Sequence, residues 1–120
     1  MIIELLKFKV APEVQENFLL KDAKIWTQAL AGYPGFLDKE IWLNPNEPTE
    51  VILIIRWASR EQWKSIPLEA LETIEQQFAQ QLGNTYQIIE SSEYQVNGTP
   101  PMKSRRKSVH RISAVRKLHS

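Results

Sequence analysis

The chain has 120 residues, enough for one domain with its own hydrophobic core, and it has no cysteine, which excludes disulfides, thiolate metal sites and cysteine nucleophiles. The net charge of +1 divides unevenly, because residues 1–102 hold eight of the fifteen Lys and Arg and all fourteen Asp and Glu, which gives −6. Residues 103–120 hold the other seven basic residues, both histidines and no acid, so we expect an acidic domain followed by a basic tail.

The first half of the chain predicts a strand, a helix and a second strand. Residues 2–10 alternate loosely and are rich in Ile, Leu, Phe and Val, as strands are. Pro12 suits the first turn of a helix, where its missing N–H costs nothing, and Gly32 suits the helix end. A second strand is predicted over 36–43, ended by the proline-rich loop 44–48. The apolar stripe of the helix comprises Val14, Phe18, Ile25 and Ala29.

The second half predicts a strand, a divided helix and a last strand. Residues 51–57 are nearly all apolar, which is typical of a central strand with both faces covered. Ser59 stands at capping-box spacing before a glutamine and begins a helix. Pro67 divides this helix in two, with Ser65 placed to cap the second piece. Residues 86–96 alternate but are more polar, as in an edge strand. The stripe of the second helical piece comprises Leu71, Ile74, Phe78 and Leu82.

This β-α-β-β-α-β order predicts an α+β, ferredoxin-like fold, with two helices on one face of a four-stranded antiparallel sheet. In the third strand the residues expected to face the helices are Val51, Leu53, Ile55 and Trp57. The other side, called the open face below, should present four aliphatic side chains, Ile3, Leu5, Ile52 and Ile54. Such a face needs a cover, which favours a homodimer with two sheets packed together. The alternative cover is the basic tail of the same chain.

Three segments of the chain resemble a known family: the opening strand IIELLKFKV, the turn Tyr33-Pro34-Gly35-Phe36, and the junction IIRWASREQW at 54–63. They are similar to the antibiotic-biosynthesis-monooxygenase-like domains of the dimeric α/β-barrel superfamily. The RW-x-S-R-E-Q-W-x-S-I-P pattern at 56–67 resembles a set of small cyanobacterial proteins with no assigned activity. The likeness predicts a dimeric α/β-barrel domain over 1–96 and a separate basic tail over 97–120. The superfamily includes oxygenases, isomerases and haem enzymes, so the fold alone does not assign a reaction.

The resemblance also carries an expectation about cofactors. Haem-degrading relatives use a helix histidine as iron ligand, whereas residues 1–109 of this chain contain no histidine. Where monooxygenase-like relatives end the third strand with a tryptophan and carry a helix histidine further on, this chain has Trp57 and then Ile66. We therefore expect no metal site and no cofactor in the domain. An oxidation that needs only a pocket, an electron-rich substrate and a base remains compatible with these residues.

The candidate ligand-pocket residues begin with the tryptophans. Trp57 and Trp63 flank the strand-to-helix turn where relatives open a cleft, and aromatic walls suit a flat organic molecule. The alternative is that the tryptophans, with Trp26 and Trp42, make ordinary core or dimer contacts. Of the carboxylates, Glu69, Glu72 and Glu75 recur every three residues, which predicts a solvated helix face.

Two cations complete the candidate set. Strand alternation places Arg56 and Lys7 on the open face, where Glu4 or Glu40 could neutralise them. They either hold an enolate or phenolate anion or form an ion pair between subunits. The candidate pocket is thus Trp57, Trp63, Arg56, Lys7 and Trp42, and the catalytic residues are left unassigned.

The N-terminus and the tail bear on location and partners. Glu4, Lys7 and Lys9 interrupt the first apolar run, no basic region precedes it, and no apolar stretch approaches the roughly 18 residues of a membrane span. We therefore expect a cytoplasmic protein without a membrane span. In the tail, apolar residues recur every three positions among basic ones, which is typical of a short amphipathic helix that binds nucleic acid, an anionic surface or the acidic domain. The alternative is a solubilising extension.

Three functions are compatible with these patterns. The first is a homodimeric small-molecule-binding domain that acts as a cofactor-independent monooxygenase on an aromatic or quinone-like substrate. The second is a non-catalytic dimeric module for ligand binding or assembly. The third is a dimeriser that presents two basic tails to an anionic partner.

Overall fold

The structure is a computed structural model that describes residues 1–98. It confirms the predicted β-α-β-β-α-β order, with the helical parts subdivided. The predicted tail, 97–120, lies outside the described residues from position 99 on. In chain order the elements are β1 (Ile2–Val10), a 3₁₀ turn (Pro12–Val14), α1 (Gln15–Lys21), a π-helical segment (Asp22–Thr27), α2 (Gln28–Ala31), β2 (Phe36–Leu43), β3 (Glu50–Trp57), α3 (Arg60–Lys64), α4 (Leu68–Leu82) and β4 (Tyr86–Gln95).

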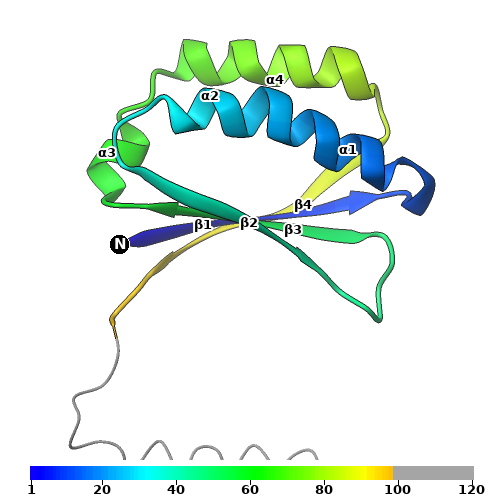
Figure 1. Ribbon diagram of the computed structural model, residues 1–120, viewed down its shortest axis with the longest axis horizontal. Helices are drawn as coiled ribbons and strands as arrows, with labels where there is room; N and C mark the ends of the chain where they lie inside the picture. Colours follow the sequence, from blue (N-terminus) through cyan, green and yellow to red (C-terminus); the bar gives the residue numbers. More distant parts are fainter. Residues whose placement is uncertain (99–120) are drawn as a thin grey trace, which may run out of the picture.

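The four strands form one antiparallel sheet in the order β2-β3-β1-β4. This order confirms two predictions: the apolar third strand lies in the interior of the sheet, and the polar fourth strand lies at an edge. Figure 1 shows α1, α2 and α4 lying together over one side of the twisted sheet, with α3 near the end of β3. No helix within residues 1–98 is long and apolar enough to cross a membrane.

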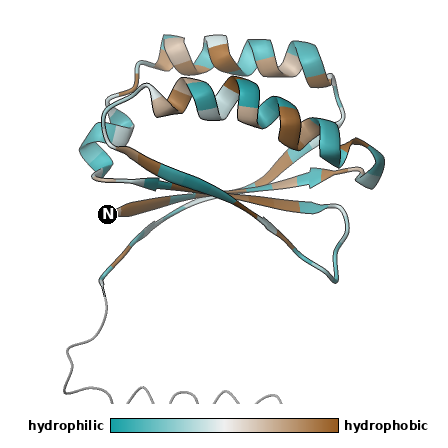
Figure 2. Ribbon diagram, viewed as in Figure 1, coloured by the Kyte–Doolittle hydropathy of each residue, from teal (hydrophilic) through white to brown (hydrophobic). Residues whose placement is uncertain are grey.

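The core lies between the sheet and the helices, as the alternation of the third strand predicts. Its helix-facing residues are all nearly inaccessible to solvent, namely Val51, Leu53, Ile55 and Trp57. Figure 2 shows apolar residues recurring along both long helical stretches and along the strands. Aromatic rings from the sheet and the helices pack edge-on or tilted at centroid distances of 5.1–6.2 Å, namely Phe8, Phe18, Phe78 and Tyr86.

The first helical stretch changes its hydrogen-bonding pattern midway, which the sequence pattern does not predict. Pro12 opens it as a 3₁₀ turn, α1 follows, and residues Asp22–Thr27 then form a π-helical segment. In a π segment the backbone hydrogen bonds join residues i and i+5 instead of i and i+4. The side chains that follow therefore point in a different direction than they would in a regular helix. Asp22, at its first position, is buried against the sheet.

The division of the second helix at Pro67 is confirmed, but one detail of the prediction is wrong. Ser59 caps α3 as predicted, because its Oγ accepts the backbone N–H of Gln62 at 3.1 Å. Ser65 does not cap α4, since Pro67 itself occupies the N-cap position without a side-chain hydrogen bond. The Ser65 hydroxyl instead donates to the Gln62 carbonyl at 2.6 Å and closes the end of α3.

Candidate functional site

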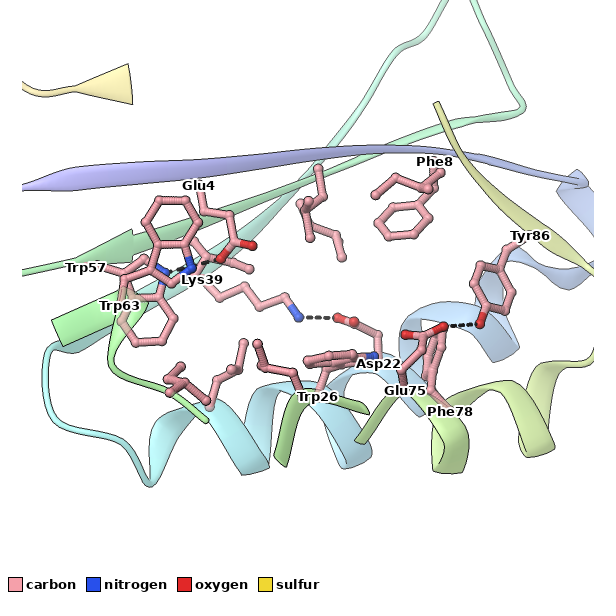
Figure 3. A pocket seen from close by; sticks show the side chains of 17 residues that line it. Glu4, Phe8, Asp22, Trp26, Lys39, Trp57, Trp63, Glu75, Phe78 and Tyr86 are labelled. Carbon is pink, nitrogen blue, oxygen red and sulfur yellow. Dashed lines mark hydrogen bonds and ion pairs between the residues drawn. The ribbon is translucent and has the colours of Figure 1, made fainter. Parts of the chain in front are cut away.

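A cavity of about 320 Å³ lies between the sheet and the helices. Its volume is in the range of sites for small organic molecules. Figure 3 shows the side chains of seventeen residues converging on it from β1, β2, β3, β4 and the helices. Its walls are largely aromatic and aliphatic, and the aromatic members are Phe8, Trp26, Trp57, Trp63, Phe78 and Tyr86.

Two of the tryptophans form one end of this cavity. Trp57, the last residue of β3, is fully buried and packs edge-on against Phe36 at a centroid distance of 5.7 Å. Trp63 projects from α3 and is only partly buried, with the Lys64 ammonium 3.9 Å from its ring centroid. The buried indole therefore supplies a rigid wall, and the half-buried one stands between the cavity and solvent.

The position of Trp63 depends on how α3 meets the start of β2. The backbone N–H of Ala58 donates to the carbonyl of Gly35 at 2.7 Å. Gly35 has φ of +92°, and a Cβ at this position would lie 2.5 Å from the Cβ of Gln62 in α3. Only glycine satisfies both the backbone conformation and the close approach of α3.

A carboxylate from the central part of the sheet reaches the cavity. Glu4 lies on the helix-facing side of β1, and its Oε1 accepts a hydrogen bond from the indole N–H of Trp57 at 3.2 Å. Burial raises the pKa of Glu4 above its ordinary value; the Trp57 hydrogen bond and the charges of Lys64 and Lys39 oppose this rise without cancelling it. The carboxylate is thus a stronger base than a solvent-exposed glutamate.

A buried ion pair lies beside it. The Nζ of Lys39, from β2, is 2.5 Å from Oδ2 of Asp22 and 3.0 Å from Oγ1 of Thr27, both in the π-helical segment. Burial raises the pKa of Asp22, and the charge and hydrogen bond of Lys39 act against that rise. Figure 3 shows the pair crossing the middle of the cavity. Asp22 stands four residues after the buried Phe18, so ordinary helical spacing directs it inward, and the π segment brings Thr27, five residues further on, to the same lysine.

The third polar contact joins β4 to α4. The hydroxyl of Tyr86 donates to Oε1 of Glu75 at 2.7 Å, and burial together with this carboxylate raises the pKa of the phenol. The predicted solvated face of Glu69, Glu72 and Glu75 is confirmed. All three side chains are exposed, but the carboxylate of Glu75 reaches the cavity rim.

Of the five candidate pocket residues, Trp57 and Trp63 line the cavity, whereas Arg56, Lys7 and Trp42 do not. These three lie on the open face. Arg56 and Lys7 have the orientation that strand alternation predicts, but the sheet separates them from the cavity. Trp42 lies there because a bulge at the start of β2, between Phe36 and Asp38, reverses the alternation of the residues that follow.

The open-face cations have partners within the chain. Arg56 pairs with Asp38 at 3.0 Å and with the predicted Glu40 at 3.1 Å, and the same glutamate accepts the indole N–H of Trp42 at 2.9 Å. Lys7 contacts Glu50 at 3.4 Å and Glu90 at 3.5 Å. The prediction of Glu4 as a partner is wrong, because Glu4 lies on the opposite side of β1 from Lys7 and faces the helices.

The cavity residues outside the candidate set include Glu4, Asp22, Trp26 and Lys39. Glu4 alternates with Leu6 and Phe8 and could have been assigned to the helix-facing side of the strand. The same bulge in β2 hides Lys39, whereas Asp22 stands four residues after Phe18 on the predicted apolar stripe and could have been placed inside. Within residues 1–98, no group of three or more His, Asp and Glu side chains is arranged to hold a metal ion.

Comparison with known proteins gives a family and a fold. The sequence model of the family described as antibiotic biosynthesis monooxygenase matches residues 1–65. Among solved structures, SnoaB of Streptomyces nogalater, described as a cofactor-independent oxygenase, matches with a TM-score of 0.58 and 16% identity over 83% of this chain and 96% of that one.

Other solved structures share the same architecture. A candidate antibiotic biosynthesis monooxygenase from Deinococcus radiodurans has a TM-score of 0.62 at 12% identity, covering 85% of this chain and 98% of that one. A conserved protein from Methanosarcina mazei has a TM-score of 0.57 at 17% identity, covering 78% and 90%. At such identities the likeness shows the fold alone. No curated protein matches the sequence.

Proposed function

This chain belongs to the antibiotic biosynthesis monooxygenase family, and from that premise we propose that it binds an aromatic or quinone-like molecule in the cavity and oxidises it with O₂ without a metal or haem. The observation that carries the proposal is the cavity itself, which three indoles line: Trp26, Trp57 and Trp63. Flat aromatic rings stack well against such walls. The description of SnoaB as a cofactor-independent oxygenase adds support for the reaction class.

The chemistry needs an electron-rich substrate. A hydroquinone can supply the electrons itself: its anion forms a C–O bond to O₂, and the resulting hydroperoxide loses water. One oxygen atom stays on the ring carbon as a new carbonyl, the other leaves as water, and a hydroquinone plus O₂ becomes a hydroxyquinone plus water. An apolar, aromatic cavity favours this route because it orients the ring and keeps bulk water from the reactive intermediate.

The binding half of the proposal is tested by isothermal titration calorimetry with 1,4-naphthoquinone. We expect Trp57→Phe and Trp63→Phe to weaken binding, because each removes aromatic wall area, and Trp42→Phe on the open face to bind like the wild type. If the wild type does not bind, or if the two cavity variants bind as well as the wild type does, the cavity is not the ligand site.

The reaction is tested by O₂ uptake with 1,4-dihydroxynaphthalene, with mass spectrometry of the product made under ¹⁸O₂. The expected product carries one labelled oxygen atom. Binding without enzyme-dependent O₂ uptake would contradict the oxygenase proposal and leave a non-catalytic ligand-binding module as the function.

We also infer that a second copy of the chain covers the open face. Ile3, Leu5 and Ile52 are partly exposed there, and the rim carries Trp42 and Tyr94, which are 47% and 53% exposed. Arg56 and Lys7 of this face are already paired within the chain, and Lys9, toward the end of β1, is exposed. A partner sheet could therefore cover the apolar part of the face without burying an unpaired Arg56 or Lys7, which is the usual obstacle to such an interface.

A further inference from the structure

We propose that Glu4 accepts the proton of a hydroxyl group on the bound molecule, which makes the substrate class a phenol or hydroquinone rather than any flat aromatic. This inference rests on the proposed function, because it requires the cavity to bind an aromatic molecule. It assigns a catalytic role to a residue of β1 that the sequence pattern suggests only as an ion-pair partner.

The three carboxylates that line the cavity within the described residues are not equivalent. Asp22 is held by Lys39 through a short ion pair. Glu75 is exposed to solvent and accepts the hydroxyl of Tyr86. Glu4 is bonded through Oε1 to the neutral indole of Trp57 and has no ion pair within residues 1–98. Of these three carboxylates, Glu4 alone is both partly buried and without a cation in contact within residues 1–98.

The second oxygen of Glu4 is free to bind a ligand. Within residues 1–98, no hydrogen bond reaches Oε2, yet every buried side-chain nitrogen or oxygen there has a partner. Oε2 must therefore be accessible, and the cavity is the space beside it. Figure 3 shows the carboxylate directed from β1 into the same volume that Trp57 and Trp63 enclose. A hydroxyl on a ring seated against these indoles can donate to this oxygen.

The charged groups around Glu4 leave it basic. In the sheet, Lys39 of β2 lies in the same cross-strand row as Glu4, with Ile55 of β3 between them. The backbones of Glu4 and Lys39 are therefore two strand spacings, or about 10 Å, apart. On the other side Glu93 of β4 is the register partner, and it is paired with Arg60 of α3. The positive charge of Lys64, in the same helix, lowers the pKa of Glu4 more than that of Lys39 does. Burial outweighs these cations and raises the pKa of Glu4, which brings its basicity closer to that of a phenol.

The proton transfer completes the proposed reaction. The carboxylate takes the hydroxyl proton, and the O–H electron pair stays on the substrate as a phenolate. This anion delivers electrons to O₂ and forms the C–O bond. The carboxyl returns its proton to the terminal peroxide oxygen, which gives the hydroperoxide. The ring C–H proton and the terminal OH of the hydroperoxide then leave as water as the O–O bond breaks, and the inner oxygen stays on the ring carbon as the new carbonyl. No redox partner other than O₂ is needed.

The test compares a hydroxylated ligand with an unhydroxylated one. We expect the wild type to bind 1-naphthol, and Glu4→Gln, which keeps an oxygen for the Trp57 indole, to bind it about tenfold more weakly, since a charged acceptor becomes a neutral one. Affinity for 1,4-naphthoquinone should be unchanged. The wild-type affinity for 1-naphthol should fall toward that of the variant as the pH is lowered through the titration of Glu4. The matched control Glu93→Gln removes the adjacent charge outside the cavity and should retain both affinities.

Turnover gives a second readout. With 1,4-dihydroxynaphthalene, Glu4→Gln should lose about 10²–10⁴-fold in O₂ uptake and lose the acidic limb of the pH profile. Equal affinity of wild type and Glu4→Gln for 1-naphthol would overturn the assignment even if both enzymes bind 1,4-naphthoquinone, and the proposed function would then stand. A wild type that binds neither compound would overturn both.

Discussion

The Nζ of Lys39 on β2 lies 2.5 Å from Oδ2 of Asp22 in the π-helical segment, and this contact joins the sheet to the first helical stretch across the cavity. Only 5% of the Lys39 side chain and 4% of the Asp22 side chain are exposed. Burying either charge without the other would cost free energy, so the pair constrains how the helix packs on the sheet.

Removal of one member of this pair should be strongly destabilising. Lys39→Met leaves the Asp22 carboxylate buried without its cation, and we expect a loss of about 3–5 kcal/mol in the free energy of unfolding, measured by urea titration. As a control, Arg60→Met breaks the exposed pair with Glu93 and should cost less than about 1 kcal/mol.

The double variant Lys39→Met, Asp22→Leu separates the charge effect from packing. Because it buries no unpaired charge, it should recover most of the loss in the single variant. A double variant as unstable as Lys39→Met alone would mean that the lost lysine packing, and not the orphaned carboxylate, causes the destabilisation.

The pH dependence of stability should differ between the wild type and Glu4→Gln. Because the pKa of Glu4 is raised in the folded state above its ordinary value of 4.5, the folded protein holds this proton more tightly than the unfolded chain does. The resulting stabilisation is complete below pH 4.5 and is lost as the pH rises through the raised pKa.

The Glu4→Gln variant carries no titrating proton at this position, so its stability relative to the wild type should increase over that same pH interval and become constant above it. Thermal or urea unfolding at a series of pH values from about 4 to 8 measures this difference. A difference that does not change with pH would show that the Glu4 pKa is the same in the folded and unfolded states.

The docking of α3 on Gly35 predicts a specific effect of adding one methyl group. Gly35→Ala places a Cβ 2.5 Å from the Cβ of Gln62 and also forces alanine into a positive φ, so we expect a stability loss well above 1 kcal/mol and a displaced Trp63 with altered fluorescence. Gly83→Ala is the matched control. It has φ of +62° but nothing within 4 Å of the new Cβ, so it should show the backbone cost without the change at Trp63.

The inferred dimer can be tested on the open face. Light scattering should give twice the chain mass of 14.0 kDa for the wild type, and Ile52→Lys should shift it to the monomer because a charge would enter the covered apolar surface. Leu20→Lys, at an exposed leucine of α1 on the helical side, should remain dimeric. A monomeric wild type would rule out the second copy as the cover of this face.

Much of the fold follows from local patterns along the chain. The apolar run of β3, the capping serine at position 59 and the breaks at Gly32 and Pro67 each depend on a few neighbouring residues, and each appears in the structure where the sequence predicts it. The division of β3 into a helix-facing set and an open-face set is equally local, because alternation within an unbulged strand leaves no other choice. One open-face residue, Ile54, is nonetheless only 1% exposed in the single chain.

The site depends on tertiary structure to a greater degree. Simple alternation from Phe36 would place Trp42 on the helix-facing side and Lys39 on the open face, but the bulge before Asp38 exchanges them. The π-helical segment brings Thr27 to the lysine that Asp22 already contacts. Both irregularities are set by how the strand pairs and how the helix packs, and neither has a local signature in the residues themselves.

The sequence by itself therefore determined the order of the elements, the apolar side of the sheet and the two tryptophans at the end of β3 and on α3, because these depend on residues close together in the chain. Only the tertiary structure decided which polar groups share the cavity. Glu4, Asp22 and Lys39 come from three elements, and strand register, the bulge in β2 and the packing of the first helical stretch on the sheet bring their side chains together.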